Sequence, residues 1–100
     1  MKKEPLEGEL LEDSHIFLHP ERYRIMELLA EKPMHISELS RALGEERRLV
    51  TYHLMALEER GFVKSKYEIS ELPNSKGKAI RVYTATEKGA EVKAKLKKEL

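Results

Sequence analysis

The chain has 100 residues, of which 40% are hydrophobic and 37% charged, and it contains no cysteine. This length suits one domain near the lower limit at which a single core is stable. Without cysteine the chain has no disulfide framework, thiolate metal site or cysteine nucleophile. We expect a cytoplasmic protein, because no apolar run approaches the ~18 residues of a membrane span and no signal peptide is evident. Abundant charge with a single asparagine and no glutamine indicates a thermophilic source.

Charge is unevenly distributed along the chain, although the formal net charge is only +1. Residues 1–31 contain eight acidic and four basic side chains, whereas residues 32–86 contain ten basic and seven acidic ones. Residues 87–100 contain five basic and three acidic side chains. An acidic first third joined to a basic remainder is typical of a polyanion-binding protein with a separate non-binding face.

Two helices are predicted between residues 20 and 44. The first covers residues 20–31 and begins with a proline, a residue that suits the first helical position. Residues 35–36 are expected to be extended. A second helix is predicted over residues 38–43, with Ser37 as its N-cap and Gly44 as its C-terminal stop.

The chain is organised around the helix predicted over residues 46–60. Val50, Leu54 and Leu57 recur in it at the spacing of one buried stripe. The opposite face carries cationic, aromatic and polar side chains, namely Arg48, Tyr52, Met55 and Glu59. A helix that reads a DNA groove requires such a combination, and a solvated amphipathic helix is the alternative. Together with the preceding helix it predicts a helix-turn-helix, in which the second helix enters the major groove.

The last forty residues predict a β-hairpin followed by a helix. Strands over residues 62–69 and 79–84 flank strong turn residues at 73–78. A two-stranded hairpin is marginally stable alone, so it must pack on the helices. The final helix, residues 87–98, has Thr86 as its N-cap. Its thin apolar stripe is more typical of a pairing seam than of a globular core.

These elements combine into a winged helix-turn-helix, a mainly α fold with a small antiparallel β-hairpin. Residues 20–29, 50–63 and 83–89 resemble winged-helix transcriptional regulators of the ArsR/MarR-like type, especially small archaeal members. The likeness spans roughly residues 15–90 and implies a homodimeric regulator that binds double-stranded DNA. The chain departs from metal-sensing members at residues 37–41, where they carry a cysteine pair, so thiolate sensing is absent.

We expect a single domain over residues 1–100, with a winged-helix core flanked by two dimerisation segments. The core covers residues 20–86, and the flanking segments cover residues 1–19 and 87–100. A short helix near the N-terminus is too short to be stable in water without packing partners. The apolar residues predicted at the dimer interface are Leu6, Leu10, Leu11, Val92 and Leu96.

In this interpretation the recognition helix, residues 46–60, enters the major groove, and the wing, residues 62–85, contacts the backbone or the minor groove. Arginine pairs most commonly with guanine in the major groove. The alternative for the helix arginines is pairing with nearby glutamates alone. Wing lysines would bind phosphate regardless of sequence. The predicted DNA contacts are Ser37, Ser40, Arg47, Arg48, Thr51, Tyr52, Met55, Lys64, Lys66, Lys76, Lys78 and Arg81.

No metal ion or other cofactor is predicted. His15 and His19 are spaced i, i+4, but Pro20 interrupts any helix there, and a zinc site needs three or four ligands. His53 flanks the buried stripe and is expected to be structural or to bind phosphate. A small-molecule effector between the dimer helices and the DNA-binding part is compatible with the resemblance, although no residue identifies it.

The acidic pair at residues 45–46 places negative charge near phosphate, yet it favours a helix N-terminus. The alternative function is a winged-helix module for protein–protein interaction, with Leu49, Tyr52 and Met55 as an exposed apolar contact. The neighbouring arginines count against it. No nucleophile–base set, phosphate loop or paired-carboxylate site is present, so we do not expect an enzyme.

Overall fold

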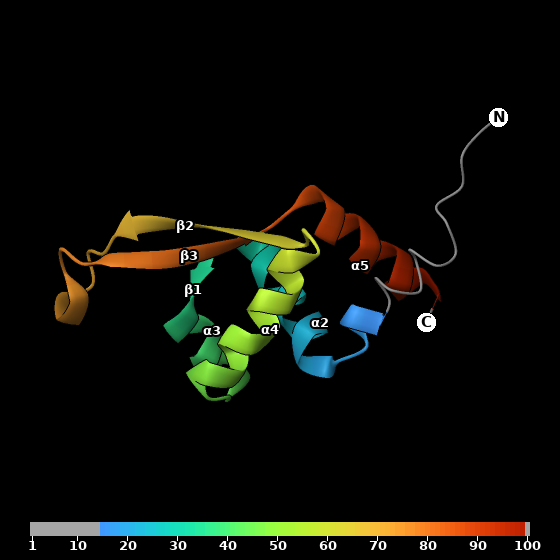
Figure 1. Ribbon diagram of the computed structural model, residues 1–100, viewed down its shortest axis with the longest axis horizontal. Helices are drawn as coiled ribbons and strands as arrows, with labels where there is room; N and C mark the ends of the chain where they lie inside the picture. Colours follow the sequence, from blue (N-terminus) through green and yellow to red (C-terminus); the bar gives the residue numbers. More distant parts are fainter. Residues whose placement is uncertain (1–14, 100) are drawn as a thin grey trace.

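The computed structural model describes residues 15–99. The β-hairpin extends away from the helices, and α5 lies at the opposite end of the molecule (Figure 1). None of the helices in this part of the chain is long and apolar enough to cross a membrane. In chain order the elements are α2 (Pro20–Glu31), β1 (Met34–His35), α3 (Ile36–Leu43), α4 (Arg47–Glu59), β2 (Val63–Ile69), the 3-10 turn η1 (Pro73–Ser75), β3 (Ala79–Ala85) and α5 (Glu87–Glu99).

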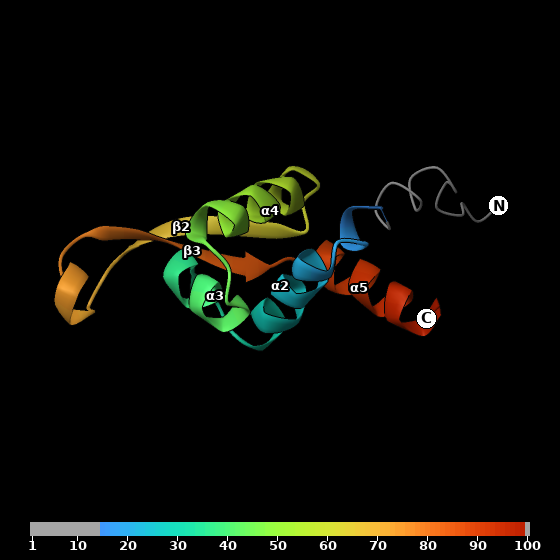
Figure 2. The ribbon, with the colours of Figure 1, turned by 90° about the horizontal axis from the view of Figure 1, so that it is seen from below.

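The sheet has three antiparallel strands in the order β1-β3-β2. The predicted hairpin is confirmed, because β2 pairs with β3 from Val63 opposite Ala85 to Ile69 opposite Ala79. The extended segment before α3 adds the third strand, in which His35 pairs with Val82. This short strand joins the wing directly to the start of α3. Figure 2 shows the molecule from below, with the wing extending from α3 and α4 on one side and α5 on the other.

The start of α3 differs from the prediction. His35, and not Ser37, is the N-cap, and the helix begins at Ile36. The Nδ1 atom of His35 accepts a hydrogen bond from the backbone N–H of Glu38, and the Glu38 carboxylate accepts one from the backbone N–H of His35. This reciprocal pair satisfies two donors that a helix start leaves unpaired, so it fixes the start earlier than the serine would. Gly44 ends α3 as predicted, with φ of 68°.

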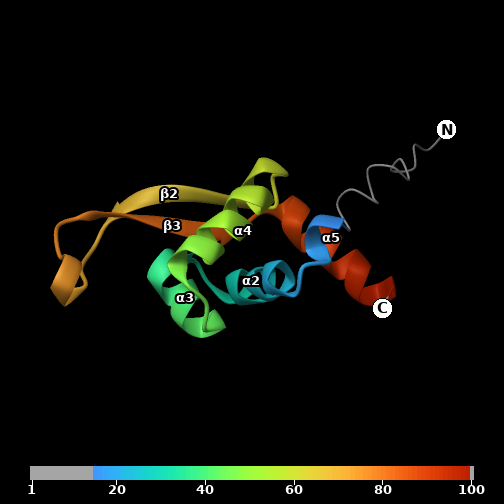
Figure 3. The ribbon, with the colours of Figure 1, turned by 60° about the horizontal axis from the view of Figure 1, so that its bottom comes forward.

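The core lies between α2, α3, α4 and the base of the sheet. Val50, Leu54 and Leu57 are fully buried, which confirms the stripe predicted for α4. They pack with residues of the other elements, among them Leu39 of α3 and Phe62 before β2. Figure 3 shows α4 crossing in front of the base of the hairpin, with the beginning of α4 next to α3. Burial of one face therefore fixes which face of α4 is left to solvent.

Helix α5 begins where its first turn packs closely against the backbone of Phe62, just before β2. Thr86 is its N-cap as predicted, since its hydroxyl accepts from the backbone N–H of Gly89 at 3.1 Å and donates to the carbonyl of Gly61 at 2.6 Å. A Cβ atom on Gly89 would lie 2.3 Å from the carbonyl oxygen of Phe62 and 2.7 Å from the terminal methyl of Met26. Only glycine therefore allows α5 to pass this close to the start of the wing.

Candidate nucleic-acid interface

The solvent-facing side of α4 is cationic, aromatic and apolar. Tyr52 and Met55 are 60% and 58% exposed, in agreement with the predicted orientation of this face. Arg47 is exposed as well. The side chain of Arg48 is 88% exposed, and its Nη2 lies 3.8 Å from Oε1 of Glu46. A pair this long in water holds the arginine only weakly, so the guanidinium remains available to a ligand.

A groove of about 360 Å³ lies where α3, α4 and β3 meet. Ser37 comes from the first turn of α3, Arg47 and Thr51 come from the first half of α4, and Arg81 comes from β3. Four of the predicted DNA contacts therefore line one groove although they are distant in the chain. The hydroxyl of Thr51 donates to the carbonyl of Arg47 at 2.8 Å, which leaves its oxygen lone pairs as acceptors.

Ser40, another predicted phosphate contact, is engaged inside the protein. Its hydroxyl donates to the carbonyl of Glu45, and its own carbonyl accepts from the backbone N–H groups of Gly44 and Glu45. The serine thus closes the turn between α3 and α4. Glu46 is the N-cap of α4, but its side chain makes no capping hydrogen bond. Its carboxylate still lies at the positive end of the helix dipole.

Arg81 is tied to the end of α4 rather than extended from the wing. Its Nε donates to the hydroxyl of Ser65 at 2.9 Å, and its Nη2 lies 3.1 Å from Oε1 of Glu58. Its guanidinium carbon is 5.4 Å from the ring centroid of Tyr83 and 6.0 Å from that of Tyr67. These contacts fix the base of the wing against α4 and neutralise part of the arginine charge. Local patterns in the sequence do not predict these contacts of Arg81.

The remaining wing cations face solvent. Lys76 and Lys78 lie at the tip, which is ordered by hydrogen bonds: the buried Ser70 accepts from the backbone N–H of Leu72 at 3.1 Å, and its hydroxyl lies 2.7 Å from that of Ser75. Within β2, Lys66 lies 3.5 Å from the carboxylate of Glu68. The exposed lysines are Lys64, Lys66, Lys76 and Lys78.

His53 lies behind the outer face of α4 and is only 5% exposed. Arg22 donates from Nε to its Nδ1 at 3.0 Å, and its ring centroid is 4.4 Å from that of His19. Burial, followed by the charges of His19 and Arg22, lowers the pKa of His53. Nδ1 of His19 lies 2.8 Å from Oε1 of Glu21. A hydrogen bond from the backbone is the main cause that lowers the pKa of Glu21.

The sequence does not predict this grouping, because helical spacing along the chain relates His19 to His15 and not to His53. Its members lie at the start of α2 and in the middle of α4, far apart in the chain. Only the packing of these two helices brings them together. Helical spacing within one segment gives no sign of such a contact.

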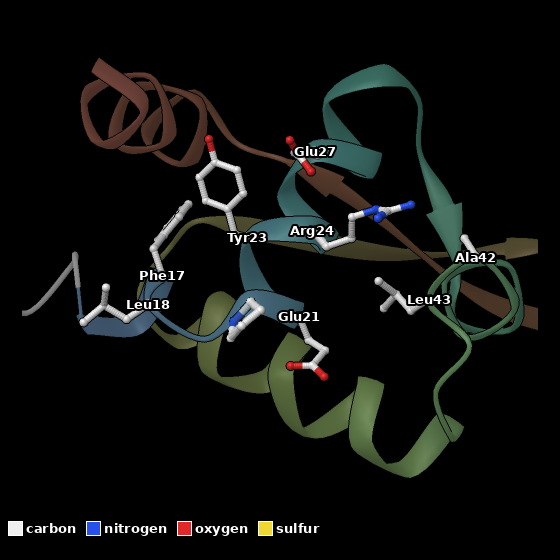
Figure 4. Close-up of a pocket in the computed structure, with 9 residues that line it drawn as sticks. Phe17, Leu18, Glu21, Tyr23, Arg24, Glu27, Ala42 and Leu43 are labelled. Carbon is white, nitrogen blue, oxygen red and sulfur yellow. The ribbon is translucent and has the colours of Figure 1, made fainter. Parts of the chain in front are cut away.

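A second cleft, of about 600 Å³, lies between α2, α3 and the residues before α2. Figure 4 shows Phe17, Leu18 and Tyr23 toward one end of it and Leu43 of α3 toward the other, with the charged Arg24 between. The lining is therefore partly apolar and partly charged. None of these residues was predicted to bind a ligand.

The residues predicted at the dimer interface fall into two sets. Leu6, Leu10 and Leu11 lie outside the described residues. Val92 is 8% exposed and belongs to the core of its own chain, and Leu96 is partly buried against that core. The apolar stripe of α5 is thus partly covered within the chain.

Comparison with known proteins agrees with the resemblance seen in the sequence. Residues 19–65 match the arsR family of bacterial regulatory proteins. No curated protein matches the chain significantly. A transcriptional regulator homologue from Pyrococcus horikoshii is 26% identical, with a TM-score of 0.69, and the match covers 87% of this chain and 85% of that one. The matched family and this relative are both regulators, the class of protein that the resemblance implies.

Two further structures are similar in fold. A transcriptional regulator of the MarR family from Enterococcus faecalis has a TM-score of 0.77 at 22% identity, covering 98% of this chain and 84% of that one. ZitR of Lactococcus lactis, solved in complex with DNA, has a TM-score of 0.61 at 22% identity, covering 79% of this chain. The chain spans about half the length of the ZitR chains. Residues 19–65 thus resemble the helix-turn-helix of the arsR family, and the described part of the chain has the winged helix-turn-helix fold of these structures.

Proposed function

We propose that the chain is a transcriptional regulator that binds double-stranded DNA as a homodimer and recognises a specific sequence. Helix α4 enters the major groove, and the wing contacts the phosphate backbone or the minor groove. The observation that carries this proposal is the exposed face of α4, which presents arginine and tyrosine side chains while its other face is buried. The DNA complex of ZitR, a protein of similar fold, supports it.

Base readout is assigned to the first half of α4. The side chain of Arg48 is 88% exposed, and a guanidinium makes two parallel hydrogen bonds to the O6 and N7 atoms of guanine. Tyr52 lies one turn further on, with its hydroxyl free to bond a base edge or a phosphate. Met55 follows on the same face and offers an apolar surface to a thymine methyl group. These three residues read sequence in the proposed complex.

Backbone contacts are assigned to the groove beside α4 and to the wing. Ser37 and Arg47 line the groove where a phosphate would lie next to the recognition helix. The exposed lysines of the wing add positive charge that does not depend on base sequence. Arg81 and Ser40 contribute less directly, because both are held by internal hydrogen bonds.

The homodimer is proposed from α5 and the segment before α2. Leu96 is only partly buried within its own chain, so a partner would complete its burial. Val92 lies one turn away and supports it from the core. A two-fold dimer places its two α4 helices in successive major grooves on one side of the duplex.

A module that binds protein is the second candidate, favoured by one observation. Leu49, Tyr52 and Met55 are all exposed large apolar side chains on one helix. A protein contact would use them as a hydrophobic patch. The proposed DNA function uses the same residues, so the two candidates differ in the part played by the arginines.

Selection of bound duplexes from random DNA tests the proposal. We expect enrichment of a near-palindrome whose half-sites lie about one helical turn, roughly 10 base pairs, apart. Binding of the selected duplex should weaken steeply as salt rises, whereas its preference over a shuffled duplex should persist. Sedimentation of the complex measures whether two chains bind one duplex.

Three results would contradict parts of the proposal separately. Failure to bind any duplex at low salt would refute DNA binding. Binding without sequence preference would refute specific regulation, and one chain per selected duplex would refute the dimer. If DNA binding fails, capture of a protein partner by both the natural chain and an Arg48→Glu variant would favour the protein-binding module.

A further inference from the structure

Three potential metal ligands meet behind the outer face of α4. His19 and Glu21 lie at the start of α2, and His53 comes from the middle of α4. One ligand atom of each lies within 4.8 Å of the other two. His53 is buried, whereas His19 and Glu21 are partly exposed, so the group opens to solvent on one side. The proposed DNA contacts do not include these three residues.

We propose that His19, Glu21 and His53 form a binding site for a divalent transition-metal ion, with Zn²⁺ as its preferred occupant. Two imidazole nitrogens and one carboxylate oxygen are a donor set that zinc accepts, with a water molecule in the fourth position. Imidazole ligands favour zinc, cobalt and nickel over magnesium and calcium, which prefer oxygen alone.

The spacing of the ligands suits such an ion. Ligand atoms about 2.0–2.1 Å from a tetrahedral ion lie roughly 3.3 Å from one another. Nδ1 of His19 and Oε1 of Glu21 are 2.8 Å apart, and all three ligand atoms lie within 4.8 Å. Small rotations of the two partly exposed side chains would bring them to His53, which the core holds in place.

Arg22 competes with a metal ion for the imidazole of His53. A neutral imidazole has one protonated nitrogen and one lone pair. In this structure the Nδ1 lone pair of His53 accepts the hydrogen bond from Nε of Arg22 at 3.0 Å. A metal ion at Nδ1 displaces Arg22. An ion at Nε2 requires the proton on Nδ1, which also ends that hydrogen bond. Metal binding and the Arg22–His53 bond therefore exclude each other.

Release of Arg22 would reach the outer face of α4. Its guanidinium carbon lies 5.5 Å from the ring centroid of Tyr52. Loss of the hydrogen bond to His53 would free the guanidinium from this position, and the cation–π contact between Arg22 and the Tyr52 ring would then be lost. An effect on DNA readout rests on the proposed function, whereas metal binding itself does not.

Metal titration of the full, untagged chain tests the site without DNA. Chelator-treated protein is titrated with Co²⁺, whose visible absorption is strong in four-coordinate sites, and Zn²⁺ then displaces the cobalt. We expect His19→Ala and His53→Gln each to weaken Zn²⁺ binding by at least about 10- to 100-fold, as losing even a supporting group does. His15→Ala, which removes an exposed histidine outside the group, should leave the affinity unchanged.

The decisive variant is Arg22→Met, which keeps the aliphatic stem and removes the competing donor. We expect it to tighten Zn²⁺ binding roughly tenfold, the effect of removing one hydrogen bond from a charged group. An unchanged or weaker affinity would overturn the proposal, and so would natural affinity in His19→Ala. Because His19 is exposed, its variant keeps the test valid if His53→Gln fails to fold. Failure here leaves the proposed DNA binding unaffected, since no DNA is present.

Discussion

The two faces of α4 differ sharply although they alternate along one short helix. Leu54 is fully buried, and its neighbour Met55 is 58% exposed. The inner face packs into the core with α2 and α3, whereas the outer face contributes little to the fold. Adjacent residues should therefore separate stability from DNA binding when they are changed one at a time.

The largest effect is expected on the inner face. Leu54→Ala should lower the free energy of unfolding by about 2–5 kcal/mol, because it removes a fully buried side chain and leaves a cavity. Urea denaturation measures the loss. Met55→Ala is the matched control and should change stability by less than about 0.5 kcal/mol. Equal losses in both variants would show that the two faces are not distinct.

On the outer face, Arg48→Ala should reduce the preference for the selected duplex on the order of 10- to 100-fold, with stability unchanged. Its side chain is 88% exposed on the outer face of α4. Competition between selected and shuffled duplexes measures the preference. Lys95→Ala removes the same charge from an exposed position on α5 and should leave the preference intact. If both variants lose it equally, overall charge and not base contact is responsible.

A smaller effect is expected from Tyr52→Phe, which keeps the ring but removes the hydroxyl. Loss of one hydrogen bond should weaken binding to the selected duplex by up to about tenfold. Fluorescence anisotropy with labelled duplex measures it. The ring contacts with Arg22 and His53 remain in this variant, so the melting temperature should not change. Unaltered affinity would remove the hydroxyl from the readout.

The smallest effect is expected at the wing tip. Lys76→Ala should weaken binding to every duplex alike and reduce the slope of log affinity against log salt by about 1, because one phosphate contact is lost. Titrations at several salt concentrations give the slope. A loss confined to the selected duplex would mean that the wing reads sequence as α4 does.

Most of the fold follows from local patterns in the sequence. The apolar spacing of α4 and the glycine at position 44 act over a few residues, so the pattern locates the helices well. The cap of α3 was missed, because a histidine paired with Glu38 outcompetes a serine that is favoured on average. The pairing of β1 was also missed, since a strand of two residues carries no recognisable period.

The candidate site was only partly predictable for the same reason. The orientation of Arg48 and Tyr52 follows from helical geometry, so the outer face was found. The engagement of Arg81 by Glu58 depends on where β3 crosses the end of α4. The meeting of His19 with His53 likewise depends on how two helices pack. Such contacts between distant segments leave no trace in local spacing.

The close crossing at Gly89 has a consequence for the span of the proposed dimer. The missing side chain lets α5 leave the domain directly against the carbonyl of Phe62, and this contact sets the direction in which α5 points. Because α5 would meet the partner chain, its direction determines how far apart the two recognition helices stand. In the proposed dimer, the spacing of the operator half-sites therefore depends on the glycine at position 89, which is not among the proposed DNA contacts.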